Sequence, residues 1–416
     1  MRGHGEVLLS LPLTLLILSA VPAAGRKRWS DREGFQSMRL KFGKESVECP
    51  CRETKFCEPI TRTNDVEIFG FAGATSNASS WDWEAITTVA WNANELMCLA
   101  HEHGARAIAA APSGMPLTSN ETVRTEWVQR TVSAVKSSFL DGITFDYESP
   151  MAWNSSEREY YVAIVRETTL AMHAALPGSQ VSVCVAWSPD DIDGRAYDVA
   201  ALAGASDLLY VMSYDTRSQI FDRCIASANS PASRASYGLQ RYIDLGISPS
   251  KLILGTPWYG YDYPCLETPE LLSESSYCTL RSVPFRSVNC SDAAGRERTY
   301  ADMMNVIVSD PSASTVARDS STQTPYFNYV VTNDTDGSRI AHQIWFDDAQ
   351  SSAAKYDVAL KLGVRGVGPF CFGDLAYDTA LARKQASDMW NALATFKEKR
   401  MKNLLLSSNS TLNALI

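Results

Sequence analysis

The alternation of short apolar runs with helical patterns constrains the fold of this chain more than any other feature. Eight apolar runs have the length and composition of strands, at residues 66–71, 87–91, 105–111, 142–148, 181–187, 208–214, 252–258 and 366–370. Helical patterns lie at residues 93–103, 121–138, 156–175, 195–204, 233–245, 349–363 and 378–397. Eight strands that alternate with helices predict an α/β protein, a closed parallel (β/α)8 TIM barrel, rather than an open sheet.

The segment 261–350 interrupts this alternation. It contains three cysteines and two strand-like runs, 326–331 and 340–346, which predict a β-hairpin. We interpret the segment as a small insertion before the last barrel strand. The barrel domain then spans residues 65–397. Residues 398–416, which are rich first in Lys and Arg and then in Leu and Ser, are predicted to form a flexible tail.

Residues 1–25 have the pattern of a secretory signal peptide. A polar start precedes the apolar stretch 7–21, which is too short to span a bilayer comfortably, and small residues follow at 22–25. An uncleaved anchor is the less favoured alternative, and no later segment approaches ~20 uninterrupted apolar residues. We therefore expect a mature chain without a membrane segment. It begins with a polar, cysteine-bearing extension at 26–64.

The cysteines, the sequons and the net charge agree with a protein of the secretory pathway. The spacing of the 10 cysteines fits no zinc site, and an oxidising compartment favours disulfides, with local pairs expected around 49–57 and 265–290. Sequons for glycosylation occur at Asn77, Asn120, Asn154, Asn289, Asn333 and Asn409. A net charge of −9 argues against nucleic acid or an anionic membrane as the partner.

Residues 141–148, with the sequence DGITFDYE, carry the clearest chemical signal. As a strand, they place Thr144, Asp146 and Glu148 on one face and apolar side chains on the other. Burying adjacent carboxylates is costly, but each perturbs the other, so one can stay protonated near neutral pH. Because residues two apart on a strand lie roughly 7 Å apart, the pair cannot easily flank a bond from opposite sides. If Glu148 is the acid, Asp146 is better suited to orient it and tune its proton, and the nucleophile must come from elsewhere, for which an N-acetyl group on the substrate's own sugar is one source.

Other side chains converge on the same predicted rim. Met212 and Tyr214 end the sixth strand, Trp258 ends the seventh, Trp345 lies in the hairpin and Phe370 ends the eighth strand. Aromatic faces suit the C–H faces of sugars, and carboxylates suit hydroxyls and a glycosidic oxygen. For Tyr214, Trp258 and Trp345, packing in the core is the competing interpretation.

The sequence offers one weak indication of a metal site. Residues 101–103 are His-Glu-His, but no third ligand lies nearby, so a solvated helix end is the favoured interpretation. Cys184 points to the inward face of the fifth strand and is expected to be a small core residue. We predict neither a metal ion nor a cofactor.

Two motifs carry a family resemblance. Residues 141–148 resemble the D-G-x-D-x-D-x-E signature of glycoside hydrolase family 18, the chitinase family, and residues 212–215, MSYD, resemble its M-x-Y-D motif. Longer similar tracts, specific to one lysosomal branch of that family, lie at 49–51, 95–98, 185–189, 257–263, 290–295 and 342–345. The resemblance covers most of the chain from about residue 49 to residue 390.

The resemblance implies a role for each matching residue. Glu148 is implied to be the general acid and then the base, and Asp146 to hold Glu148 and the acetamido nitrogen of the substrate. Tyr214 is implied to hydrogen-bond the acetamido carbonyl oxygen as that oxygen attacks C1. Met212 and Asp215 are implied to shape the sugar site. The intermediate is an oxazoline, and the anomeric configuration is retained, as in substrate-assisted glycosidases.

The sequence departs from the family pattern at two positions. Thr144 stands where most members have an Asp, although the lysosomal branch also tends to lack an acid there. Thr144 can still donate a hydrogen bond to Asp146. Phe370 stands where the family usually has a Trp beneath the sugar, which predicts a smaller platform without an N–H donor.

These observations predict a glycosidase that hydrolyses β-1,4-linked N-acetylglucosamine. The resemblance implies exo-action from the reducing end, on chito-oligosaccharides and on the chitobiose core of free N-glycans, in the lysosome or an equivalent vacuole. A secreted endo-acting chitinase and a catalytically inactive chitinase-like lectin are the alternatives, and the presence of Glu148 argues against the lectin. We expect a monomer.

Overall fold

Eight parallel strands close into a barrel, in a computed structural model that describes residues 48–274 and 277–413. The barrel strands are β1 (Glu67–Phe71), β2 (Thr88–Ala90), β3 (Arg106–Ala110), β4 (Gly142–Phe145), β5 (Gln180–Ala186), β6 (Leu208–Met212), β7 (Leu252–Pro257) and β13 (Gly366–Phe370). They pair in the order β1-β13-β7-β6-β5-β4-β3-β2, so that β13 closes the barrel against β1. All eight predicted strands are present, and the predicted parallel barrel is confirmed.

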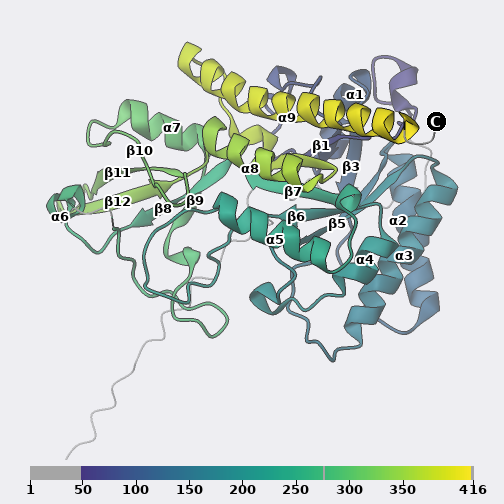
Figure 1. Cartoon of the computed structure of the whole chain (residues 1–416), viewed down its shortest axis with the longest axis horizontal. Helices are drawn as coiled ribbons and strands as arrows, with labels where there is room; N and C mark the ends of the chain where they lie inside the picture. Colours follow the sequence, from purple (N-terminus) through teal and green to yellow (C-terminus); the bar gives the residue numbers. More distant parts are fainter. Residues whose placement is uncertain (1–47, 275–276, 414–416) are drawn as a thin grey trace, which may run out of the picture.

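Helices surround the barrel on its outer face (Figure 1). Within the described residues they are α1 (Ala93–Glu102), α2 (Glu121–Ser137), α3 (Glu157–Ala175), α4 (Val199–Ala205), α5 (Ala232–Asp244), α8 (Ala349–Leu362) and α9 (Ala380–Asn413). Short 3-10 helices occur at η3 (Thr54–Cys57), η4 (Ala78–Ser80), η5 (Ile192–Gly194), η6 (Pro249–Lys251), η7 (Asp292–Ala294) and η8 (Phe372–Asp374). Among the described helices, none combines the length and the apolar character that a bilayer-spanning segment needs.

The barrel separates two buried layers. In β5, Val181, Val183 and Val185 pack toward the helices, whereas Cys184 faces the barrel interior. This period of two is the alternation that a strand imposes on its side chains. The inner layer is largely aromatic, and the ring centroids of Phe69 and Tyr210 lie 5.2 Å apart in it. Inward-facing residues at the carboxyl ends of the strands therefore meet at one end of the barrel.

The segment between β7 and β13 forms a separate sheet, drawn on the left of Figure 1. Its elements are β8 (Tyr259–Pro264), α6 (Pro269–Glu274), β9 (Arg296–Thr299), α7 (Tyr300–Ser309), β10 (Ala317–Arg318), β11 (Pro325–Thr332) and β12 (Arg339–Trp345). The strand order is β10-β11-β12-β8-β9, and β11 and β12 pair antiparallel. The insertion thus begins at Tyr259, two residues before the predicted boundary at 261.

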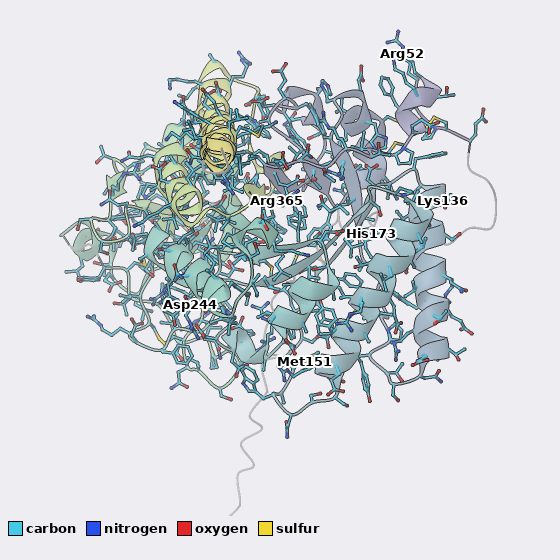
Figure 2. All side chains as sticks on the ribbon, turned by 45° about the vertical axis from the view of Figure 1, so that its right-hand side comes forward. Arg52, Lys136, Met151, His173, Asp244 and Arg365 are labelled. Carbon is cyan, nitrogen blue, oxygen red and sulfur yellow. A yellow bond between two sulfur atoms is a disulfide. The ribbon has the colours of Figure 1, made fainter. Side chains whose placement is uncertain are left out.

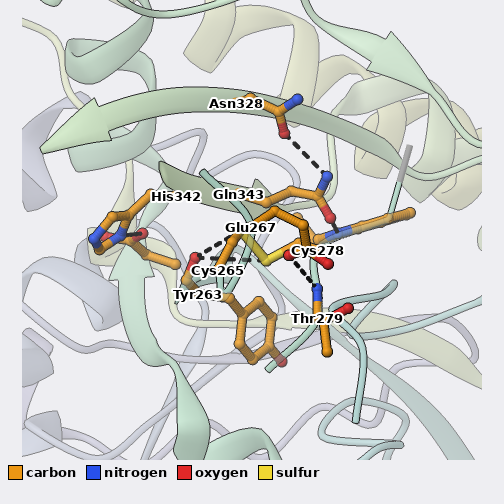
Figure 3. The surroundings of a disulfide bond; sticks show 10 residues. Tyr263, Cys265, Glu267, Cys278, Thr279, Asn328, His342 and Gln343 are labelled. Atoms are coloured by element: carbon orange, nitrogen blue, oxygen red, sulfur yellow. Dashed lines mark hydrogen bonds and ion pairs between the residues drawn. A yellow bond between two sulfur atoms is a disulfide. The ribbon is translucent and has the colours of Figure 1, made fainter. Parts of the chain in front are cut away.

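Four disulfides cross-link the described residues. They join Cys49 to Cys57, Cys51 to Cys98, Cys224 to Cys290 and Cys265 to Cys278. The pair Cys265–Cys278 lies in the inserted segment, beside Gln343 of β12 (Figure 3). Cys184 and Cys371 are free and buried. The expectation of disulfides is confirmed, but local pairing holds only for Cys49–Cys57 and Cys265–Cys278, because Cys51 and Cys290 pair with cysteines outside the two predicted clusters.

A buried ion pair anchors the end of the N-terminal extension. His101 Nε2 lies 2.8 Å from Asp141 Oδ2, and His101 Nδ1 lies 2.8 Å from the Phe56 carbonyl oxygen. The Ile60 amide donates to Asp141 Oδ1 at 2.8 Å. Because both ring nitrogens of His101 face acceptors, both must donate, and the ring is the imidazolium. The prediction of a solvated helix end is therefore wrong for His101, although His103 is exposed.

Two predictions on the ends of the chain can be compared with the structure. The predicted signal peptide, 1–25, lies outside the described residues. The predicted flexible tail, 398–416, is instead helical through Asn413 as part of α9. Arg400 explains part of this difference, because its Nε and Nη2 donate to the carbonyl oxygens of Val364 and Gly363 at 2.9 and 2.7 Å.

Most of the predicted glycosylation sites can be placed on the structure. The exposed sequon residues are Asn77, Asn120, Asn154, Asn289 and Asn333. Asn120 precedes α2, and its side-chain oxygen accepts a hydrogen bond from the Val123 amide. The side chain of Asn409 lies outside the described residues.

We predict that the His101–Asp141 pair makes stability depend on pH. Burial lowers the pKa of His101, but the hydrogen bond and charge of Asp141 outweigh it, so the net pKa is raised. The stabilisation is therefore fully present below the unfolded-state pKa of about 6.5 and is lost as pH rises through the folded-state pKa. In urea unfolding, His101→Asn should lower the free energy of unfolding more at pH 5 than at pH 8.

The matched control for this prediction is His173→Asn. His173 Nε2 also lies 3.0 Å from a carboxylate, Asp207 Oδ2, but its side chain is 43% exposed. Such an exposed pair contributes about 0–1 kcal/mol, so the control should change little between the two pH values. Equal losses for His101→Asn at pH 5 and pH 8 would contradict the assignment of a buried imidazolium.

Candidate active site

Asp141 and Gly142, the first two residues of the motif at 141–148, fix the position of β4. Asp141, at the amino end of β4, is buried by its contacts with His101 and Ile60, so it anchors the strand far from the rim. Gly142 allows β4 to approach β5, because an added Cβ would lie 1.9 Å from the Gln180 carbonyl oxygen. The strand ends at Phe145, not at 148 as predicted.

Asp146 lies just beyond β4 and is half-buried, with one oxygen of its carboxyl group enclosed. Its Oδ1 atom is buried and has no hydrogen-bond partner among the described residues, while the Cys184 thiol contacts the same carboxyl group. The predicted hydrogen bond from Thr144 to Asp146 is not found. Instead, Thr144 Oγ1 lies 3.6 Å from Cys184 Sγ. Burial raises the pKa of the Cys184 thiol, which keeps this thiol protonated.

Asp146 and Glu148 differ sharply in their surroundings. Burial, and to a smaller extent the negative charge of Glu148, raise the pKa of Asp146 to about 8, while Arg195 opposes the shift. The side chain of Glu148, in contrast, is 56% exposed. Two carboxylates so close to one another can share a proton, and the raised pKa of Asp146 favours Asp146 as the member that holds it.

Arg195 is the closest charged partner of Glu148, and the sequence did not single it out. Its Nη1 donates to Glu148 Oε2 at 2.9 Å, and its side chain is only 8% exposed. Arg195 lies in the loop between β5 and α4, where the sequence predicted the start of a helix. The sequence could have pointed to Arg195 through its position after a barrel strand, because the loops at that end of the barrel carry functional residues in this fold.

Met212 ends β6 and Tyr214 follows it, where the Tyr214 hydroxyl interacts electrostatically with Asp146. Met212 is half-buried and packs against the inner aromatic layer. Tyr214 is 8% exposed, and its ring centroid lies 5.6 Å from that of Phe370 and 5.9 Å from that of Tyr259. Burial raises the pKa of the Tyr214 hydroxyl, so this group stays a proton donor over the physiological pH range.

Asp215 is held by partners that the sequence did not reveal. The hydroxyls of Tyr259 and Tyr261 donate to its Oδ1 at 2.6 and 3.0 Å. Its amide donates to Asn229 Oδ1 at 2.7 Å, and its φ angle of 50° is left-handed. The two tyrosines come from the first strand of the insertion, so the inserted sheet positions a side chain of the barrel rim.

Of the three predicted aromatic sugar contacts, two lie in the same buried cluster as Tyr214. Phe370 is 7% exposed and packs between Trp91 and Phe71, at centroid distances of 5.6 and 5.3 Å. Trp345 stacks on Tyr326 at 4.6 Å, and its indole N–H donates to Gln343 Oε1 at 2.7 Å. Asn328 accepts from Gln343 Nε2 at 3.0 Å, as Figure 3 shows.

The prediction that Trp258 contacts substrate is wrong. Its side chain is 1% exposed and lies in the outer layer, where its ring centroid is 5.0 Å from that of Trp390 of α9 and 5.9 Å from that of Phe372. The competing core interpretation therefore holds. The residue follows β7 by one position, which turns its side chain away from the inner face.

The positions of the loops agree with a site at one end of the barrel. Met151, which follows residues 141–148, lies low on the molecule in Figure 2, and His173 and Arg365 lie higher, toward the other end of the barrel.

Among the described residues, two groups of side chains have spacings that suit a metal ion, Cys49–Cys51–Cys57 and Cys265–Glu267–Cys278. The cysteines of both groups are in disulfides.

Comparison with solved structures concerns the fold. The Group IV chitinase of Ostrinia furnacalis in complex with allosamidin superposes with a TM-score of 0.62 at 16% identity, covering 80% of this chain and 99% of that chain. A class V chitinase mutant from Cycas revoluta in complex with (GlcNAc)3 gives 0.59 at 19% identity, covering 78% and 99%. At this level of identity, the likeness shows a shared barrel.

Comparison of sequences identifies the family. Di-N-acetylchitobiase of Rattus norvegicus is 41% identical over 350 residues, which cover 83% of this chain and 92% of the rat protein. Di-N-acetylchitobiase of Homo sapiens is 39% identical over 360 residues, covering 86% and 90%. The model of glycosyl hydrolases family 18 matches residues 62–372, which include the whole barrel rim described above. The chain therefore belongs to glycosyl hydrolase family 18.

Proposed function

We propose that the chain is a retaining exo-glycosidase that hydrolyses β-1,4-linked N-acetylglucosamine in chito-oligosaccharides and in the chitobiose core of free N-glycans. The enclosed Asp146 two residues before the half-exposed Glu148 is the observation that carries the proposal, because the pair can hold one proton and release it toward a bound sugar. The identity to di-N-acetylchitobiases supports this substrate class.

In the proposed mechanism the substrate supplies the nucleophile. Binding moves the proton from Asp146 to Glu148, and Glu148 donates it to the glycosidic oxygen as the C1–O bond breaks. The acetamido carbonyl oxygen forms a bond to C1 while Tyr214 donates a hydrogen bond to that oxygen. The Asp146 carboxylate then accepts a hydrogen bond from the N–H of the oxazolinium ion and balances its charge.

The second half of the reaction returns the enzyme to its resting state once the proton that Glu148 takes from water has passed back to Asp146. Glu148, now a carboxylate, removes a proton from a water molecule as its oxygen attacks C1, and the oxazolinium ring opens to restore the acetamido group. Two displacements at C1 retain the β configuration. Met212, Asp215 and the Phe370 ring shape the space around the sugar, and Trp345 completes its aromatic wall.

The proposed setting is glycoprotein degradation in the lysosome or an equivalent vacuole, reached through the secretory pathway. Disulfides and exposed sequons support an oxidising, glycosylating route. We propose that the enzyme acts as a monomer. A secreted endo-acting chitinase is the second candidate, favoured by the likeness of the barrel to chitinases.

We predict that the wild type releases N-acetylglucosamine from the reducing end of chitotriose at acidic pH and that Glu148→Gln lowers kcat by about a thousandfold. The loss follows from removal of the general acid, which typically contributes 10²–10⁴. Asp146→Asn should lower kcat similarly. Liquid chromatography of products from chitotriose and from borohydride-reduced chitotriose measures both the rate and the end that is attacked.

The matched control is Glu126→Gln, which removes an exposed carboxylate on α2 and should leave the rate unchanged. Binding of chitotriose by the wild type without turnover would show a lectin and refute the enzyme proposal. Cleavage of reduced substrate or of interior bonds would refute exo-action from the reducing end and favour the chitinase alternative.

We also predict that replacing the N-acetyl group by N-trifluoroacetyl on the reacting sugar lowers kcat by about a hundredfold or more. Fluorine withdraws electrons from the carbonyl oxygen, and a poorer nucleophile slows a step in which that oxygen attacks C1. Stopped assays on two synthetic disaccharides, one with the N-acetyl group and one with the N-trifluoroacetyl group on the reacting sugar, measure the ratio of the two kcat values. Equal rates on the two substrates would show that the protein, and not the substrate, supplies the nucleophile.

A further inference from the structure

The loop between β5 and α4 adopts an unusual backbone to present Arg195. Asp191, Asp193 and Gly194 have φ angles of 56°, 57° and 73°, all left-handed. Such conformations are costly for residues other than glycine and persist where the surroundings enforce them, often at functional sites. Here the Met151 amide donates to the Gly194 carbonyl at 2.8 Å, and the Ala196 amide donates to the Met151 carbonyl at 3.0 Å.

The same loop is tied directly to the segment that carries Glu148. The Tyr197 hydroxyl lies 2.8 Å from the Tyr147 carbonyl oxygen and 2.7 Å from that of Ser149, the two neighbours of Glu148. Arg158 of α3 donates to the Ala196 carbonyl at 2.6 Å. These hydrogen bonds fix the backbone around Glu148 relative to the backbone around Arg195. The fold therefore holds the two side chains facing each other.

Arg195 itself is held on its far side. Its Nε donates to the Ile192 carbonyl at 3.3 Å, and its Nη2 lies 3.5 Å from Asp193 Oδ2. Ser218 in turn donates to Asp193 Oδ1 at 2.7 Å. The guanidinium is thus fixed and buried, while the carboxylate it binds belongs to the exposed Glu148. In such a pair the carboxylate is the member that moves.

We propose that Arg195 is a positioning residue that latches Glu148 away from the enclosed Asp146 in the ligand-free enzyme, and that a bound sugar displaces this latch. The inference rests on the proposed function and concerns the regulation of the same site. While Glu148 is bound to Arg195, the shared proton stays on Asp146. When substrate draws Glu148 off the guanidinium, Glu148 receives the proton that it donates to the glycosidic oxygen.

The latch has a consequence for the pH dependence of the reaction. The charged and titratable groups that face the pair are Cys184, Asp193, Arg195, Tyr147, Tyr161, Tyr197, Tyr214 and Arg286. Of these, Arg195 lowers the pKa of Asp146, which burial and Glu148 otherwise raise to about 8. Removing the guanidinium therefore raises this pKa further, and the proton needed for catalysis is retained to higher pH.

The test compares wild type with Arg195→Gln, with chitotriose as substrate from pH 4 to pH 10. In the wild type, kcat/KM should fall above about pH 8 as Asp146 loses its proton. In Arg195→Gln this alkaline limb should move up by about one pH unit, the shift typical of a close opposite charge. KM should fall about threefold because substrate no longer has to displace the Arg195–Glu148 ion pair, and kcat should change by less than about threefold.

Three further variants keep the test decisive. Arg195→Met fills the same buried space and serves if the glutamine variant does not fold. Arg195→Lys keeps the charge and should restore the wild-type alkaline limb. Arg241→Gln is the matched control, because Arg241 also binds a carboxylate of this loop, Asp190 at 2.9 Å, without contact to Glu148, and its profile should superpose on that of the wild type.

Two results would overturn the proposal. One is an alkaline limb of the neutral variants that coincides with that of the wild type. The other is a large loss of kcat with a raised KM, which indicates a purely structural role. Both leave the proposed function intact as long as the wild type turns over chitotriose. An inactive wild type would instead contradict the proposed function itself.

Discussion

The repulsion between Asp146 and Glu148 is the constraint on which the rest of the site depends. They are two residues apart, and one of them is enclosed, so a single proton between them is the stable arrangement. The structure provides for both members. The Cys184 thiol contacts Asp146, and Arg195 binds the carboxylate of Glu148 at the rim. When the proton moves from Asp146 to Glu148, the pair has the protonation state that the proposed acid step requires.

The barrel could be predicted from the sequence because each strand is an apolar run and all but the first are followed by a helix before the next barrel strand, so local pattern and global fold agree. The motif residues Asp146, Glu148 and Tyr214 could be placed because strand ends meet at one rim. Arg195 could not be placed, because its partner lies 47 residues earlier in the chain and only the left-handed loop brings the two together. Local pattern carries no information on such a contact.

Three other differences between the sequence predictions and the structure also come from contacts that the local sequence does not reveal. His101 pairs with Asp141 across 40 residues, which turns an unremarkable helical histidine into a buried cation. Trp258 is one position past β7, and that single step decides whether its ring faces the sugar or helix α9. Residues 398–413 continue α9, in part because Arg400 donates to carbonyl groups at the end of α8. Each depends on tertiary contacts that override local composition.

The departures from the family motif also gain a physical account. Thr144 directs its hydroxyl to Cys184, so the thiol, and not the threonine, contacts Asp146. Phe370 packs on Tyr214 with its ring tilted and meets Trp91 edge-on.

The most direct test of the central claim is the configuration of the first product, followed by proton NMR during the first minutes of chitotriose cleavage. The account predicts that the new reducing end appears as the β anomer, and initial formation of the α anomer would contradict it.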